Sequence, residues 1–487
     1  MLIDRYPPED VFARVPELAD QTDPVLVHLD RLLDDDMLYQ QVRADLARRY
    51  RLPPVHGRHS TPGEALLRLL VIKHLYGWSF EETEQRVADS LVLRWFCRLY
   101  FRRVPDETTL LRWAHTIRPA TLQALLDRVA LLAQRARVAR ARKLRVDATV
   151  VETPIHYPTD SGLLGDGVRV LTRLIQRAKP LLHDRVADGQ TAFRNRMRSM
   201  RRTLQALYRV VRRKAESAAA EQRALYARLI HLAEQTHRQA QRIRQALRQL
   251  RPPRRSPTAG RRRPSAPKRL RAELAHLLPL VAQVIHQART RVLAGAQVPA
   301  QENLVSLFEP HPRVLRRHKT GTPVEFGRQV VLDEVEGGIV TRFRVLGPGE
   351  LERHELAPAV AHHRAVFGRA PYLVTGDRGF HVPGQELALE AAGVRHIVVP
   401  AAGRVPAGRR ARERTRAWRR RYRWRAGIEG RIHSLRRDYG LRRCRAHSEI
   451  GLQRDVGWGL LASNLHHIAT AQVARAVRLG AGHARAA

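Results

Sequence analysis

The chain is poor in cysteine and in long apolar runs. Only two of its 487 residues are cysteines, Cys97 and Cys444. Two cysteines cannot build a disulfide framework or a multi-cysteine zinc site, and they fit a reducing compartment. No uninterrupted apolar run reaches the roughly 20 residues that a transmembrane helix needs, and Met1–Arg14 lacks a signal-peptide pattern. We therefore expect a cytoplasmic protein with no membrane partner.

Acidic residues are also scarce. The 46 Asp and Glu residues face 88 Lys and Arg residues, which gives a formal net charge of +42. This excess predicts a polyanionic partner, and nucleic acid is the commonest one. Most of the cations are arginine, whose planar fork matches phosphate oxygens. A ribosomal or chromatin-like binder is the simplest alternative, and the length of the chain and the placement of its acids argue against it.

The first 136 residues have the pattern of short helices joined by tight turns. Thr61–Glu64 and Ser79–Glu82 have the composition of capping boxes, and Asp106 is a further candidate helix cap. The sequence therefore predicts an all-helical N-terminal DNA-binding domain over residues 1–136. A helix-turn-helix-like reader and a plain helical bundle both remain compatible with this pattern.

A strand pattern begins at Lys143–Val151, where apolar and polar residues alternate. Strands resume near Val324, and Gln329–Val335 and Ile339–Leu346 flank a Glu-Gly-Gly turn that predicts a hairpin. Two further strands and three helices follow. The expected fold is α/β: a ribonuclease H-like mixed-sheet core over residues 140–167 and 322–450, followed by a C-terminal helical segment over 451–487.

A helical, arginine-rich insertion is expected over residues 168–321, between the first and second core strands. Within it, Arg251–Ala272 has nine basic residues, five prolines and no acid, which predicts an extended linker. The linker is either a solvated loop or a contact with the DNA backbone. In the second case Arg261, Arg262 and Arg263 would bind phosphate.

Three carboxylates stand in well-defined contexts. Asp147 lies within the first strand among apolar neighbours, where an unpaired carboxylate is costly. Asp377 follows the predicted strand Tyr372–Thr375, at the end where α/β sheets bind ligands. Glu429 lies in an arginine-rich helix predicted over about Thr415–Tyr439. If the three converge, they form a cage of oxygen ligands for two Mg²⁺ ions, which could activate a nucleophile and stabilise a leaving oxygen in phosphodiester chemistry.

Each acid also has a structural explanation when taken alone. Asp147 could be a capped aspartate, Asp377 could belong to an ordinary turn, and Glu429 could pair with Arg425 along a helix. Several other acids are less suitable as ligands: Glu152, Asp160 and Asp166 follow Asp147, and Asp333, Glu334 and Glu336 are expected to be solvated near the hairpin turn. His362-His363 and His466-His467 are expected to be structural, because no cysteine or carboxylate lies at zinc-like spacing.

The helical face Tyr422-x2-Arg425-x3-Glu429-x6-Arg436 resembles the tyrosine–arginine–glutamate–lysine signature of bacterial insertion-sequence transposases of the DDE superfamily. Asp377-Arg-Gly-Phe resembles their second motif, and Val146-Asp147-Ala148-Thr149 resembles their first. Glu64–Trp113 resembles their helical N-terminal domain. The chain departs from the signature at Arg436, where the family has lysine, and in the length of its insertion.

The resemblance implies a Mg²⁺-dependent enzyme, with Mn²⁺ as a substitute, whose catalytic and metal-binding residues are Asp147, Asp377 and Glu429. It implies cleavage at inverted-repeat ends of double-stranded DNA, transfer into target DNA, and a homodimer or larger assembly at the bacterial nucleoid. Tyr422, Arg425 and Arg436 would contact the DNA. A nuclease of the same fold that does not join strands, and a non-catalytic basic nucleic-acid-binding protein, are the alternatives.

Overall fold

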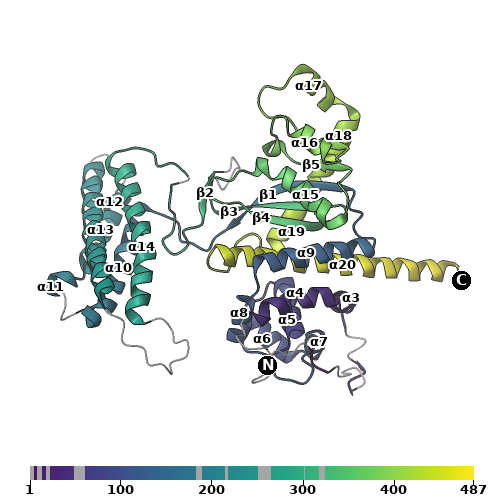
Figure 1. Cartoon of the computed structure of the whole chain (residues 1–487), viewed down its shortest axis with the longest axis horizontal. Helices are drawn as coiled ribbons and strands as arrows, with labels where there is room; N and C mark the ends of the chain where they lie inside the picture. The colour runs from purple at the N-terminus through teal and green to yellow at the C-terminus, as the bar shows by residue number, and fades with distance from the viewer. Residues whose placement is uncertain are drawn as a thin grey trace. The chain divides into compact units, whose positions relative to one another are not determined.

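The structure is a computed structural model of the chain (Figure 1). It describes residues 5–7, 14–17, 22–48, 61–182, 189–213, 218–250, 265–300, 302–316 and 324–486. The chain falls into two compact units, one formed by residues 1–154 with 328–487 and the other by residues 155–327. The finer four-part division predicted from the sequence stays a prediction.

The N-terminal part of the first unit is helical, as expected. Ser79 and Glu82 form a complete capping box at the start of one helix, and Asp106 accepts from the backbone amide of Thr109 at 2.8 Å at the start of another. The capping box expected at Thr61 is absent, because Pro62 is the N-cap residue and makes no side-chain cap. The helices are α3 Pro24–Leu33, α4 Asp36–Ala47, α5 Gly63–Tyr76, α6 Phe80–Asp89, α7 Leu91–Phe96, α8 Glu107–Ala114 and α9 Pro119–Arg135.

The chain forms a mixed sheet, most of whose strands belong to the first unit, and this confirms the α/β class. Its order is β2-β3-β1-β5-β6, with β4 paired to β3. β3 and β4 are antiparallel and form the predicted hairpin, and β1, β5 and β6 are parallel. The strands are β1 Lys143–Glu152, β2 Arg313–Arg316, β3 Val324–Val335, β4 Ile339–Val345, β5 Leu373–Thr375 and β6 His396–Val398. No pattern in the sequence indicates β2, a four-residue strand that pairs with the first residues of β3.

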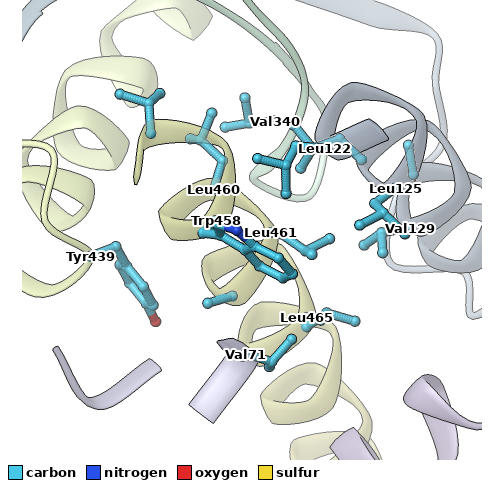
Figure 2. Packing of buried hydrophobic residues seen from close by; sticks show 14 of the residues in the cluster. Val71, Leu122, Leu125, Val129, Val340, Tyr439, Trp458, Leu460, Leu461 and Leu465 are labelled. Carbon is cyan, nitrogen blue, oxygen red and sulfur yellow. The ribbon is translucent and has the colours of Figure 1, made fainter. Parts of the chain in front are cut away.

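Helices complete this core. They are α15 Leu356–Phe367, α16 Gln385–Ala391, α17 Ala407–Arg414, α18 Arg416–Arg423, α19 Gly427–Asp438 and α20 Glu449–Ala486, with short 3-10 turns at Glu352–His354, Arg378–Phe380 and Trp424–Ala426. α20 packs on α9, α5, α3 and β4. Figure 2 shows Leu461 of α20 facing Leu125 and Val129 of α9, while the Trp458 ring points towards Val71 of α5. The buried amide of Asn464 also binds both backbone groups of Val340, so the helical and sheet parts share one hydrophobic core.

The second unit is a helical bundle with its own apolar core. Its main helices pack against one another (Figure 1) and are α10 Asp160–Leu182, α12 Met197–Arg212, α13 Ala218–Gln249 and α14 Ala266–Ala288, with the short α11 Gly189–Ala192 beside them. The prediction of an extended linker over Arg251–Ala272 is wrong for residues 266–272. Residues 266–272 begin α14, because Pro267 lies in the first turn, where proline is pre-organised for a helix. Arg261, Arg262 and Arg263 lie outside the described residues.

Candidate active site

The two aspartates of the candidate site lie at matching positions on neighbouring strands. β1 and β5 are parallel, and Arg145 pairs with Thr375. Asp147 and Asp377 each follow that pair by two residues, and Asp377 keeps an extended backbone, with φ −78° and ψ −177°. Neighbouring strands lie about 4.8 Å apart and side chains alternate with a period of two. The two carboxylates therefore belong to the same face of the sheet.

Asp377 is held by the turn that follows it. Its Oδ1 accepts from the backbone amide of Gly379 at 2.8 Å and so begins the 3-10 turn, which the buried ring of Phe380 anchors. A side chain at position 379 would collide with Glu352 and approach Asp377 Oδ1 to 3.0 Å. A larger residue at position 379 would therefore require the Glu352 carboxylate to move. The same contact brings Glu352 beside Asp377 as a further carboxylate, which no sequence motif indicates.

Asp147 is almost buried and strongly perturbed. One carboxylate oxygen accepts from the backbone amide of Ala148 at 2.8 Å, and the other from Arg425 at 3.3 Å. The pKa of Asp147 is raised to about 6: burial is the main cause, the charges of Asp377 and Glu429 add to the rise, and the Ala148 amide and Arg425 oppose it. Asp147 therefore lies within electrostatic range of both Asp377 and Glu429. A buried carboxylate with a raised pKa is a common feature of functional sites.

Glu429 enters the site from the first turn of α19, where the helix dipole favours a negative charge. Arg425 joins it to Asp147: the guanidinium donates to Glu429 at 2.6 Å and to Asp147 at 3.3 Å. The same guanidinium lies 5.5 Å from the ring centroid of Tyr422, which stacks on Trp418. Tyr422, Arg425 and Glu429 are therefore neighbours, although they do not lie on one continuous helix.

The single helix predicted over Thr415–Tyr439 is wrong. α18 and α19 are separated by a 3-10 turn at Trp424–Ala426. Arg145 of β1 explains the break, because it donates to the carbonyl of Trp424 at 2.8 Å and takes an acceptor that a continuous helix would use internally. The Arg145 side chain also fills the space where a Cβ on Gly427 would lie.

Arg145 is itself a positioning residue that no sequence pattern indicates. It pairs with the fully buried Glu334 of β3 at 2.5 Å and lies 4.8 Å from the ring centroid of Trp424. The expectation that Asp333 and Glu334 are solvated is wrong: both are buried, and Asp333 pairs with Arg342 at 2.5 Å. Arginines from neighbouring segments compensate these buried charges, and a single-sequence pattern cannot reveal such partners.

Arg436 lies against β1. It donates to Thr149 Oγ1 at 3.4 Å and to the carbonyl of Val150 at 3.3 Å. These contacts hold α19 on the strand that carries Asp147, so Arg436 supports the geometry of the site. The role predicted for Arg436 in DNA binding stays a prediction, as do the roles of Tyr422 and Arg425.

The three acids offer hard oxygen donors of the kind that Mg²⁺ prefers. Among the described residues, no three His, Cys, Asp or Glu side chains lie close enough to hold one metal ion together. The residues fit a metal site by their chemistry and by their positions: one carboxylate lies on a strand, one on the turn after the neighbouring strand and one on a helix, and a partly buried arginine compensates two of them. Displacement of the Arg425 guanidinium would leave Asp147 and Glu429 free to bind another cation.

The acids that compete with Asp147 have other partners. Asp160 accepts from Arg291 at 2.7 Å, and Asp166 pairs with Arg169 at 2.7 Å. Glu152 is tied through its backbone to Arg442 and Cys444. Of the histidines, His363 is buried and bound to the carbonyl of Arg369 at 3.1 Å, and His362 pairs with Asp127 at 3.0 Å.

No helix within the described ranges is both long and apolar enough to cross a membrane.

The chain matches two family models, "Transposase domain (DUF772)" over residues 14–116 and "Transposase DDE domain" over residues 328–465. It is 30% identical over 129 residues to "Uncharacterized protein ORF8 in nfe locus" of Rhizobium meliloti; the match covers 25% of this chain and 61% of that protein. No solved structure matches it. The first match falls on the helical N-terminal part and the second on the part that contains Asp377 and Glu429, and together they support an insertion-sequence transposase with a DDE domain.

Proposed function

We propose that the protein is a DNA transposase that cuts double-stranded DNA at inverted-repeat ends and joins the cut ends to target DNA. The observation that supports the proposal is the pairing of Asp147 and Glu429 through Arg425, with Asp377 at the position equivalent to Asp147 on the neighbouring strand, within a match to a transposase DDE domain. Domains of this family use divalent metal ions, and we infer Mg²⁺, with Mn²⁺ as a substitute. The bound ion would activate the attacking oxygen and stabilise the leaving one.

The chain's own residues would position the DNA. Arg425 is an arginine with two carboxylate partners and one aromatic neighbour, so it can exchange a carboxylate for a phosphate oxygen without losing charge compensation. Tyr422 and Trp418 provide a stacked aromatic surface beside it, suited to the end of a DNA strand. Arg436 would keep α19 on β1 while the DNA is bound, and its positive charge would favour a phosphate nearby.

Strand joining requires two ends and a target in one complex. We infer that at least two copies of the chain assemble on the transposon ends, at the nucleoid of the bacterial cell. The +42 net charge supports a substrate that is a long polyanion. Arg261, Arg262 and Arg263 would add contacts to its backbone.

The test is a reaction on DNA that carries the inverted repeats flanking the gene. With Mg²⁺, the protein should nick at the repeat boundary and then join a pre-cleaved end to a second duplex. Cutting without joining would identify a nuclease of the same fold. Tight binding without cutting, in Mg²⁺ and in Mn²⁺, would identify a non-catalytic DNA-binding protein.

A further inference from the structure

The helical unit of residues 155–327 carries a strongly basic groove. Between the end of α13 and the start of α14 lies a groove of about 550 Å³. Among the described residues, its lining consists of four cations and two small residues, with no acid and no aromatic side chain: Arg244, Arg248, Lys268, Arg271, Ala272 and Ala275. We call this the α13–α14 groove.

The four cations of the groove have no acidic partner among the described residues. Other arginines of the same unit do: Arg177 pairs with Glu273 at 2.9 Å and Arg291 with Asp160 at 2.7 Å. The sequence between the two helices, residues 251–264, contains no acid that could serve as a partner. Like charges gathered on adjacent helix turns destabilise the fold slightly unless an anion compensates them. The groove therefore has the charge distribution of a site for an external polyanion.

The lining also indicates which anion fits. Arg244 and Arg248 lie one helical turn apart, about 6 Å along the axis, and duplex DNA carries a phosphate about every 3.4 Å along each strand. Arginine forks contact phosphate oxygens in pairs, and the alanines let a backbone approach closely. The described residues that line the groove include no aromatic ring on which unpaired bases could stack and no side-chain amide that could read a base edge.

We propose that the α13–α14 groove is a second DNA-binding site, which contacts the phosphate backbone of duplex DNA without reading its sequence. The helical insertion would thereby add contacts with the DNA backbone to those made at the carboxylates. This inference rests on the proposed function, because it takes DNA to be the substrate.

The test compares matched variants of the full-length protein on a duplex of about 30 base pairs with arbitrary sequence. Arg244→Ala/Arg248→Ala removes two groove cations. Arg201→Ala/Arg202→Ala removes the same charge from exposed positions of α12, outside the groove. The groove variant should bind roughly tenfold more weakly, and its plot of log Kd against log salt should be shallower by about 1.8, or 0.9 for each phosphate that the removed arginines would neutralise.

Chemical labelling gives a second readout that needs no substitution. Lys268 lines the groove, and the exposed Lys179 on α10 of the same unit does not. Acetylation followed by mass spectrometry should show DNA protecting Lys268 several-fold while Lys179 reacts as it does in the free protein.

Each of the other outcomes contradicts the proposal that the α13–α14 groove binds duplex DNA. Equal losses of affinity in both double variants would mean that charge acts diffusely. Unchanged binding of the groove variant, with Lys268 unprotected, would show that DNA binds elsewhere while leaving the proposed transposase function intact. A groove effect seen with single-stranded RNA and not with duplex DNA would assign the groove to another ligand. Failure of the wild-type chain to bind any duplex would overturn the proposed function as well.

Discussion

Asp147 and Asp377 occupy equivalent positions on two neighbouring parallel strands, each two residues beyond the paired residues Arg145 and Thr375. This relationship fixes two of the three carboxylates through backbone pairing alone. The third, Glu429, depends on side-chain contacts: Arg145 positions the turn before α19, and Arg425 ties Glu429 to Asp147. Changes in α19 should therefore disturb the site more easily than changes in the sheet.

The contact between Gly427 and Arg145 should be sensitive to a single methyl group. A Cβ at position 427 would overlap the Arg145 guanidinium, whereas one at Gly430 would meet nothing within 4 Å. We expect Gly427→Ala to lower the free energy of unfolding by about 1–3 kcal/mol, because Arg145 must leave Trp424 or Glu334. Gly430→Ala should be neutral or stabilising by up to about 1 kcal/mol. Urea unfolding measures both, and equal values would contradict the role given to Arg145.

Replacing Arg425 tests whether its side chain contacts phosphate or only forms a salt bridge on the helix. An exposed i,i+4 pair contributes only about 0.2–0.5 kcal/mol, so its removal alone should leave strand transfer nearly normal. If Arg425 also positions phosphate, Arg425→Ala should lower single-turnover transfer on pre-cleaved ends by roughly tenfold or more, because misplaced reactants lose the advantage of orientation. Arg419→Ala, an exposed arginine of α18, is the control. Wild-type transfer by Arg425→Ala would leave only the three carboxylates in the proposed site.

The contacts of Arg436 with β1 should contribute to the stability of the fold. These two contacts predict that Arg436→Ala lowers the free energy of unfolding by about 0.5–1.5 kcal/mol. Arg436→Lys should lower it less, since an ammonium group can still donate to one of the two oxygens and the family has lysine at this position. Chemical denaturation of both variants checks the order. A lysine variant as unstable as the alanine variant would mean that both contacts of the fork are required.

His363 should make the protein sensitive to mild acid. Its side chain is buried and donates through Nδ1 to the carbonyl of Arg369, and burial lowers its pKa to about 4. The unfolded chain therefore binds a proton between about pH 6.5 and 4 that the folded chain excludes. The stabilisation is complete above pH 6.5 and is lost as the pH falls towards 4, by on the order of 2–3 kcal/mol. Urea midpoints at both ends of this range should differ less for His363→Gln than for the wild type; an identical pH dependence would exclude His363 as the cause.

The elements that could be predicted from the sequence are those set by local pattern. Alternation identifies β1, the Glu-Gly-Gly turn identifies the β3–β4 hairpin, and the Ser79–Glu82 box identifies the start of α6. The 3-10 break before α19 and the burial of Asp333 and Glu334 could not be predicted in this way. They depend on arginines distant in sequence, Arg145 and Arg342, whose partners become visible only in the folded chain.

In the candidate site, too, some residues could be predicted from local sequence and others could not. The motifs identify Asp147, Asp377 and Glu429 because each stands in a recognisable local context. The neighbour Glu352 and the positioning residue Arg145 have no such context, and they reach the site only through tertiary packing. The i,i+4 spacing predicts the contact of Arg425 with Glu429, but nothing local predicts its contact with Asp147.

The most direct test of the central claim is single-turnover cleavage of an inverted-repeat end by Asp377→Asn in Mg²⁺, with DNA binding measured on the same preparation. The amide keeps the shape of the side chain and can still accept from Gly379, but it removes the charge. We predict that cleavage is abolished while duplex affinity and thermal melting stay close to those of the wild type. Cleavage at the wild-type rate would contradict the assignment of Asp147, Asp377 and Glu429 as the catalytic carboxylates.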